Sequence, residues 1–264
     1  MNILKKKLIY FYHLIKFFLG RGALLKGNYK TLKKAKKNSN GYDDKKIFEK
    51  IKKNFLLSRK LKNRYEQDSL IINKPRYSLS SSLGIILSPK ILKKINIIDY
   101  GGSLGTIYFQ YKKIIDNIQL IKWNIVEQDA FVNFGKKNIK DKKINFYSNL
   151  NECLLKQRPN VFFASSSLQY VEYPYKILKK VSNFKNIKFI IIDKSPFHPN
   201  VETIKIQHNP RSIYKQSYPV HIFNKSKMIK FMHKNHFQLI DSFECENMLF
   251  NVNYYGLIFI RKKK

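Results

Sequence analysis

A carboxylate followed by a glycine-rich turn is the stretch of this chain best suited to holding a small ligand. Asp99 ends a β-branched run, and Gly101, Gly102 and Gly105 lead directly into an apolar, helix-like segment. Strand, tight turn and helix in this order present backbone N–H groups and a helix N-terminus to an anionic or polar ligand. The next predicted strand ends in Glu127. We therefore expect a ligand site between two carboxylates at one edge of a sheet.

The spacing of the glycines helps to identify the ligand. A dinucleotide fingerprint starting at Gly101 would need glycine at 103 and 106, where Ser103 and Thr106 stand. The pattern Asp-x-Gly-Gly-x-x-Gly is similar to the first motif of class I S-adenosylmethionine (SAM) methyltransferases. SAM offers an ammonium, a sulfonium and a ribose diol but no phosphate, so carboxylates are its natural partners. The turn therefore favours SAM over NAD, and the alternative is a βα turn that binds nothing.

The charge of the chain is strongly positive. Its 264 residues include 52 Lys and Arg against 17 Asp and Glu, a formal net charge of +35. A basic surface is typical of proteins that bind nucleic acid or anionic membranes. However, lysines dominate, accompanied by many Ile and Asn residues, whereas bidentate phosphate recognition favours Arg. We interpret the charge mainly as the codon bias of an AT-rich genome, with a selected polyanion surface as the second interpretation.

The cysteines and histidines do not form a metal-binding pattern. Cys153 and Cys245 are far apart, and His233 and His236 have no further ligand at a suitable spacing. We expect no metal and a reducing, cytoplasmic setting.

The N-terminal segment has two interpretations. Residues 1–20 place three lysines before an aromatic run that His13 and Lys16 interrupt, and they show no small-residue cleavage site. The run is too short and too charged to span a bilayer. It is either an amphipathic helix at the surface of the inner membrane or a helix packed on the core. Residues 21–40 are predicted to be a linker, followed by a helix from about 41 to 59.

From residue 95 onward, predicted strands and helices alternate. Strands are expected at 95–99, 122–127, 144–147, 160–164 and 187–193, with helices at 104–117, 128–138, 150–157, 173–183 and 225–235. Such alternation predicts a parallel sheet covered on both faces. The last two strands, 237–243 and 254–260, have no helix between them and should pair antiparallel. The prediction is an α/β, Rossmann-like, mostly parallel seven-stranded sheet at 91–264, with a basic helical extension at 1–90.

Several strings together resemble one family, the SAM-dependent methyltransferases associated with bacterial surface-polysaccharide biosynthesis. They are Gly41-Tyr-Asp, Glu66-Gln-Asp-Ser69, Ile98-Asp-Tyr-Gly-Gly-Ser-Leu-Gly105, Tyr108-Phe-Gln110, Trp123-Asn-Ile-Val-Glu-Gln128, Ser166-Ser-Leu-Gln-Tyr170, Ile192-Asp-Lys-Ser-Pro-Phe197 and Gln216-Ser-Tyr-Pro219. The resemblance covers about residues 41–260 and implies a fold and a cofactor, SAM, but no specific acceptor.

The resemblance also implies roles for individual residues. The turn, with Asp99, Gly101, Gly102, Ser103 and Gly105, would line the methionine moiety. Glu127 would accept hydrogen bonds from the ribose hydroxyls, and Gln128 and Ser148 (or Asn149) would lie near the adenine. Ser165, Ser166 and Leu168 would face the reactive methyl group, although the serines suit a helix cap equally well.

Methyl transfer to an oxygen or nitrogen of high pKa also needs a general base. The candidates are Asp193 and His198 after the fifth strand and Tyr170 after the fourth, with Tyr218 and His221 in the following insertion. The alternatives are a turn cap or a Lys194 partner for Asp193, and an ordinary loop position for His198. The insertion 198–222 is predicted to form the acceptor pocket, and its tyrosines would suit a glycan or another small molecule.

Other functions stay open at this stage. A nucleotide-sugar or NAD-dependent enzyme is disfavoured by Ser103 and Thr106. A non-catalytic Rossmann-like scaffold or a polyanion-binding (RNA) protein would explain the absence of an obvious base. An RNA methyltransferase would suit the charge, but the chain lacks an Asn/Asp-Pro-Pro-Tyr motif after the fourth strand.

Overall fold

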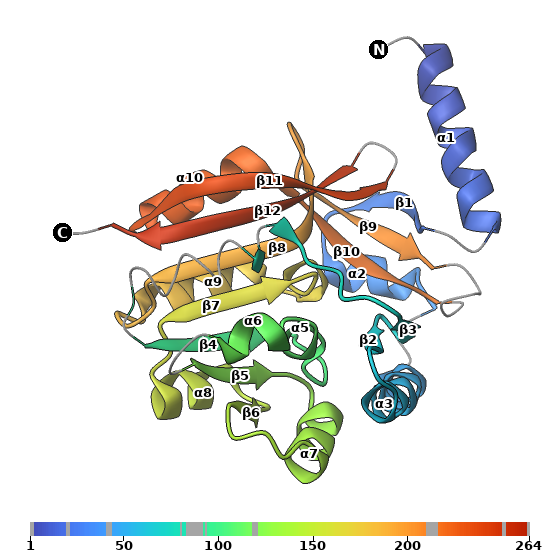
Figure 1. The fold of residues 1–264 in the computed structure, drawn as a ribbon. Coiled ribbons are helices and arrows are strands. Elements are labelled where there is room, and N and C mark those ends of the chain that lie inside the picture. The colour runs from blue at the N-terminus through green and yellow to red at the C-terminus, as the bar shows by residue number, and fades with distance from the viewer. Residues whose placement is uncertain are drawn as a thin grey trace.

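The computed structural model describes residues 3–19, 22–40, 44–79, 81–82, 92, 94–117, 121–209, 216–249 and 252–262. A twisted sheet with the strand order β6-β5-β4-β7-β8-β12-β11 forms its centre (Figure 1). The strands from β6 to β8 are parallel, and β12 is antiparallel to both of its neighbours. The strands are β4 (Ile95–Tyr100), β5 (Ile121–Val126), β6 (Ile144–Tyr147), β7 (Val161–Ser165), β8 (Phe189–His198), β11 (Phe237–Leu249) and β12 (Val252–Arg261). The predicted mostly parallel sheet with its antiparallel last strand is confirmed.

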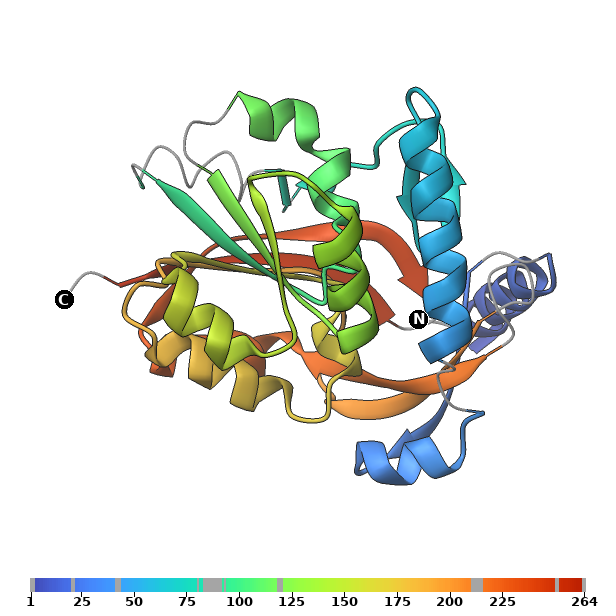
Figure 2. The ribbon, with the colours of Figure 1, turned by 90° about the horizontal axis from the view of Figure 1, so that it is seen from below.

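Helices cover both faces of this sheet (Figure 2). Along β8, Ile190 and Ile192 face one core while Phe189 and Ile191 face the other, which explains why residues 189–192 are all apolar. The first core includes residues of α8 (Leu150–Gln157), α9 (Pro174–Asn183) and α10 (Lys225–Lys234). The second includes residues of α5 (Thr106–Gln110), α6 (Lys112–Asp116) and α7 (Asp129–Asn138). The helix predicted at 104–117 is thus two short helices that meet at Tyr111.

A second group of strands extends the carboxyl edge of the sheet. β8 continues beyond β7, and its last two residues pair in parallel with β10 (Ser217–Asn224). β10 pairs antiparallel with β9 (Thr203–His208), and β9 pairs antiparallel with β1 (Leu24–Tyr29). The linker predicted at 21–40 is therefore wrong, because this segment forms β1 and α2 (Leu32–Lys37). Their apolar side chains join those of β9 in a small core.

The remaining N-terminal elements lie beside the glycine turn or away from the body. The helix predicted at 41–59 is α3 (Asp44–Lys60), and its Ile47, Ile51 and Phe55 pack with Leu104 and Phe131. A hairpin follows, formed by β2 (Tyr65–Gln67) and β3 (Leu70–Ile72). Helix α1 (Ile3–Phe18) projects from the body beside β1 (Figure 1). Among the described residues, no helix has the length and apolarity needed to cross a membrane.

Candidate functional site

The glycine turn, residues 101–105, joins β4 to α5 at the carboxyl edge of the sheet. The Gly101 N–H donates to the carbonyl that ends β5, at 2.9 Å, and its φ of +73° lies in the left-handed region that glycine tolerates. A Cβ on Gly101 would lie 2.5 Å from the Cβ of Ser167, and one on Gly102 would lie 2.5 Å from the Asp99 carboxylate. The packing of the turn itself therefore requires glycine at both positions.

The side chain of Asp99 packs against this turn at Gly102. Its carboxylate is 1% exposed and accepts a hydrogen bond from the indole Nε1 of Trp123 at 2.9 Å. Burial, with a contribution from the negative charge of Glu127, raises the pKa of Asp99 to about 7. The structure thus places Asp99, predicted to line the methionine moiety, beneath Gly102 and against Trp123.

The rest of the turn supplies polar groups. Ser103 has a φ of +55°, and its hydroxyl is buried without a hydrogen-bond partner among the described residues. Gly105, with a φ of +90°, is the N-cap residue of α5, and its N–H donates to the Gly102 carbonyl at 2.9 Å. A buried hydroxyl with no partner is costly, so Ser103 Oγ is a group that a bound ligand would satisfy.

Glu127 follows β5 directly, at the same edge as the turn. Its carboxylate lies close enough to the end of β4 to raise the pKa values of Asp99 and Tyr100, in both cases after the larger effect of burial. Its Oε2 accepts from the backbone N–H of Gln128 at 3.1 Å. Gln128 and Ser148 are both exposed, at the starts of α7 and α8 respectively. The structure thus brings Glu127 to the turn and places the two predicted adenine neighbours at the surface beside it.

The end of β7 packs against the turn through serines. The Ser167 hydroxyl donates to the Tyr100 carbonyl at 2.6 Å, fastening this loop to the end of β4. Ser166, exposed and with a φ of +52°, accepts from the Gln169 side chain at 3.1 Å. Ser165 donates to Asp193 Oδ2 at 2.8 Å. Serines predicted to face the methyl group therefore also hold the β7 loop in place.

Asp193 is a buried acceptor for three hydroxyl groups. Its side chain is 0% exposed, and Oδ2 lies 2.8–2.9 Å from the hydroxyls of Ser78, Ser81 and Ser165. The first two belong to a segment that precedes β4, so this carboxylate links the N-terminal part of the chain to β7 and β8. The sequence predicts Asp193 as a base, whereas in the structure its carboxylate holds these three serines together by hydrogen bonds.

His198 lies at the end of β8 and stabilises the following turn. Its Nδ1 accepts hydrogen bonds from the backbone N–H groups of Asn200 and Val201 at 3.2 and 3.1 Å. His198 is thus the last residue of β8 rather than a loop residue, and its ring holds the turn that follows.

Tyr170 belongs to a tyrosine–amide cluster with Gln207, Asn209 and Tyr218. Its hydroxyl donates to Gln207 Oε1 at 3.3 Å, and its ring meets that of Tyr218 edge to face. Gln207 and Asn209 both donate to the Tyr218 hydroxyl, at 3.1 and 2.8 Å. Removal of water from around its hydroxyl raises the pKa of Tyr170 well above its ordinary value, so Tyr170 acts here as a donor.

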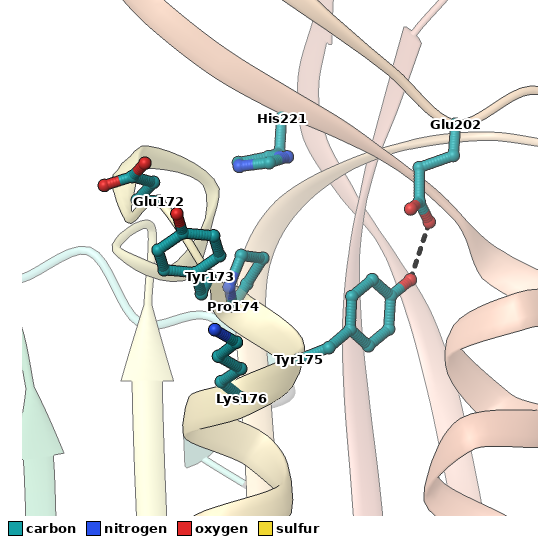
Figure 3. Close-up of a pocket in the computed structure, with 7 residues that line it drawn as sticks. All are labelled: Glu172, Tyr173, Pro174, Tyr175, Lys176, Glu202 and His221. Carbon is teal, nitrogen blue, oxygen red and sulfur yellow. Dashed lines mark hydrogen bonds between the residues drawn. The ribbon is translucent and has the colours of Figure 1, made fainter. Parts of the chain in front are cut away.

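A pocket of about 180 Å³ lies where α9 begins, just after the loop that follows β7 (Figure 3). Its lining residues are Glu172, Tyr173, Pro174, Tyr175, Lys176, Glu202 and His221. Two of them, Glu202 and His221, come from the insertion 198–222 in which the sequence predicts the acceptor pocket. Tyr175 donates to Glu202 at 2.6 Å, and Glu202 also pairs with Lys227 at 2.7 Å. The pocket thus has aromatic walls and a fixed carboxylate.

His221 lies above the start of α9 in this pocket (Figure 3). Its Nε2 is buried and has no hydrogen-bond partner among the described residues, while the backbone of Val171 and Glu172 lies near the ring and partly offsets the lowering of its pKa. Burial lowers the pKa of His221 below 6.5, so the ring is neutral at pH 7. A neutral imidazole has an unshared electron pair at the nitrogen that carries no proton, which is Nε2 when the proton is on Nδ1.

Glu66 is a buried acid beside the turn that was not among the predicted site residues. Its carboxylate accepts from the Ser69 N–H at 2.9 Å and from the Thr106 hydroxyl at 2.6 Å. Burial raises its pKa to about 7. Thr106 is the first residue of α5, so Glu66 ties the β2–β3 hairpin to the glycine turn. Glu66 lies in one of the strings of the family resemblance, which is the signal that pointed to it.

The residues of the site fit the parts of SAM. Glu127 would accept hydrogen bonds from the ribose hydroxyls, and the Ser103 hydroxyl would form a hydrogen bond with a polar group of the methionine moiety. Among the described residues, no cluster of three His, Cys, Asp or Glu side chains is arranged to bind a metal.

Comparison with solved structures shows the same fold. The chain matches the N-terminal domain of EvdMO1, in crystals obtained with S-adenosylhomocysteine (SAH) and D-fucose, with a TM-score of 0.51 and 9% identity over 84% of this chain and 98% of that one. It also matches the CcbJ methyltransferase from Streptomyces caelestis (TM-score 0.48, 8% identity, 75% and 94% covered). A third match is Burkholderia thailandensis 1,6-didemethyltoxoflavin-N1-methyltransferase with SAH (0.45, 9%, 70% and 78%).

No protein-family model matches the sequence, and no curated protein is similar enough to count as a relative. The strand order and the structural match together define the class: the chain has the Rossmann-like fold of class I SAM-dependent methyltransferases.

Proposed function

We propose that the protein is a SAM-dependent methyltransferase. The observation that supports this most directly is the placement of the glycine turn beside Glu127, at the carboxyl ends of two adjacent parallel strands. Ligands of open α/β sheets bind at this edge. The buried, unpartnered hydroxyl of Ser103 adds a group that a ligand would satisfy. When bound, SAM supplies an electrophilic methyl group, and the protein's part is to position the acceptor and remove its proton.

For the base, three observations support His221. Its Nε2 has no hydrogen-bond partner among the described residues, its lowered pKa keeps the ring neutral, and its side chain lines a pocket. In contrast, Asp193 already accepts from three hydroxyls, and His198 Nδ1 from two backbone amides. We assign Asp193 and His198 to holding the carboxyl edge together, and Tyr170 to donating a hydrogen bond.

The proposed acceptor is a hydroxyl group of a glycan or of a precursor of a surface polysaccharide. The aromatic and carboxylate lining of the pocket suits a polyhydroxylated ring, because tyrosine provides both an apolar face and a hydroxyl. The resemblance in sequence to methyltransferases associated with polysaccharide genes agrees with this class. One structural neighbour was also crystallised in the presence of a sugar, D-fucose.

Calorimetric titration with SAM and with NAD tests the cofactor. Wild-type protein and a Glu152→Ala control should bind SAM with the same micromolar affinity, because Glu152 is an exposed glutamate on α8. Glu127→Ala should bind at least about tenfold more weakly, since a hydrogen bond to a charged group contributes about 1.5–3 kcal/mol. The proposal would be contradicted if folded wild-type protein does not bind SAM, or if the Glu127→Ala variant binds SAM as tightly as wild type. Binding of NAD alone would favour a dehydrogenase-type enzyme.

A further inference from the structure

Helix α1 exposes an apolar stripe to solvent. Leu8, Phe11, Tyr12, Ile15, Phe18 and Leu19 are 44–81% exposed. They recur every three or four residues, so they share one face of the helix. The helix projects from the body, and none of its described residues belongs to the two cores of the sheet (Figure 1). A soluble surface rarely keeps so many large apolar side chains together unless something covers them.

The charge around the stripe is of one sign. The first 42 residues contain eleven Lys and Arg and no Asp or Glu. Three lysines precede the stripe, and Lys16 stands within α1 with its ammonium 4.6 Å from the centre of the Tyr12 ring. Four further lysines on α2, at 33, 34, 36 and 37, are exposed. The partner of this segment should therefore combine an apolar phase with negative charge.

We propose that α1 binds in the plane of an anionic phospholipid bilayer, with the stripe among the acyl chains and the lysines at the headgroups. Interfacial helices combine an apolar face with Lys and Arg, and each basic residue near an anionic surface strengthens binding. The 16 residues of α1 extend about 24 Å, less than the roughly 30 Å of a hydrocarbon core, so the helix lies on the bilayer rather than across it.

Pairing with a second copy of α1 is the competing arrangement. It would cover the same stripe, but it would bring two sets of lysines together with no acidic residue in the first 42 positions to neutralise them. The bilayer satisfies both the apolar face and the charge. This inference is independent of the proposed methyl transfer.

Co-sedimentation of the full chain with vesicles tests the proposal. One vesicle contains phosphatidylglycerol and phosphatidylcholine, and the other phosphatidylcholine alone. The test variant is Phe11→Ser/Ile15→Ser/Phe18→Ser. Because these three side chains are exposed, the substitutions should leave the melting temperature unchanged. The control is Leu155→Ser, which removes a 70% exposed leucine from α8.

Wild type and control should bind the anionic vesicles at least about tenfold more tightly than the neutral ones, and added salt should weaken this binding. The triple variant should lose it. Absence of binding to anionic vesicles, or equal binding by the triple variant, would overturn the proposal. If the wild type is a dimer that does not bind vesicles and the triple variant is a monomer, the stripe is a self-association surface.

Discussion

The indole of Trp123 donates a hydrogen bond to the carboxylate of Asp99, with 2.9 Å between Nε1 and Oδ2. Both side chains are buried, and Trp123 is the single tryptophan of the chain. Asp99 lies directly beneath Gly102 in the glycine turn. The protein's only indole fluorophore therefore contacts the acid that supports the proposed cofactor site.

We expect the fluorescence of Trp123 to report the ionisation of Asp99. Because burial raises the Asp99 pKa to about 7, the emission should change with a midpoint near pH 7. Asp99→Asn retains an acceptor for the indole and should abolish the transition. A midpoint near the ordinary 3.8, or an unchanged transition in Asp99→Asn, would show that this carboxylate is not perturbed as the geometry indicates.

The second prediction concerns Glu66, whose pKa is raised from 4.5 to about 7. Between these values the folded chain keeps the proton and the unfolded chain releases it, so this group's stabilising contribution is complete below pH 4.5 and is lost as pH rises through 7. In wild type this effect lowers the free energy of unfolding by about 3 kcal/mol as pH rises, and Glu66→Gln should abolish that decrease. Urea unfolding at pH 5 and pH 8 measures this difference.

Glu49→Gln is the matched control, because Glu49 is exposed on α3 and pairs with Lys52 at 3.0 Å. It should leave the pH dependence of stability as in wild type. If Glu66→Gln also follows the wild-type curve, Glu66 has an ordinary pKa in the folded chain.

Much of the α/β core could be predicted because its strands contain continuous apolar runs, as in residues 189–192 of β8, separated by helices with apolar periodicity. The β1-β9-β10 group was not predicted. β1 contains Gly27 and pairs with a strand far along the chain, as in Leu24 with His208, so no local pattern reveals it. β9 does alternate, with Ile204 and Ile206 buried, and that signal was available.

Only those parts of the site that follow directly from the order of strands and turns in the sequence could be predicted. The glycine turn and Glu127 follow from strand ends, which topology brings together. The link between Glu66 and Thr106, 40 residues apart, and the partners of Asp193 depend on tertiary packing that spacing does not encode. The unpartnered Nε2 of His221 likewise becomes visible only when the surrounding chain is in place.

The third prediction separates anchoring from catalysis at Asp193. Asp193→Ala removes the acceptor of three hydroxyls and should lower the free energy of unfolding by about 3 kcal/mol or more. It should also speed amide exchange around Ser78 and Ser81. Asp193→Asn keeps one acceptor oxygen and should restore most of the stability. The control is Asp241→Ala, which removes an exposed acid from β11.

If Asp193 instead acts as a general base, the result differs. Asp193→Asn would then fold and bind SAM like wild type but lose methyl transfer, whereas an anchoring acid is rescued by asparagine in both stability and activity.

The last prediction concerns His221. Its ring should titrate below pH 6.5 because burial lowers its pKa, and a ring that acts as a base through Nε2 should carry its proton on Nδ1. Nitrogen-15 NMR of the imidazoles, with His221→Gln used for assignment, measures both properties. The unfolded chain takes up a proton at higher pH than the folded one, so His221 should cost stability as pH falls below 6.5.

The same property sets the pH dependence expected of a general base. The rate of methyl transfer should fall on the acid side with the His221 midpoint, and His221→Gln should lose both this limb and most of the rate while SAM affinity is unchanged. A ring that titrates above 6.5 or is protonated on Nε2 would remove the unshared pair from the pocket, and the base would have to be sought elsewhere at the carboxyl edge.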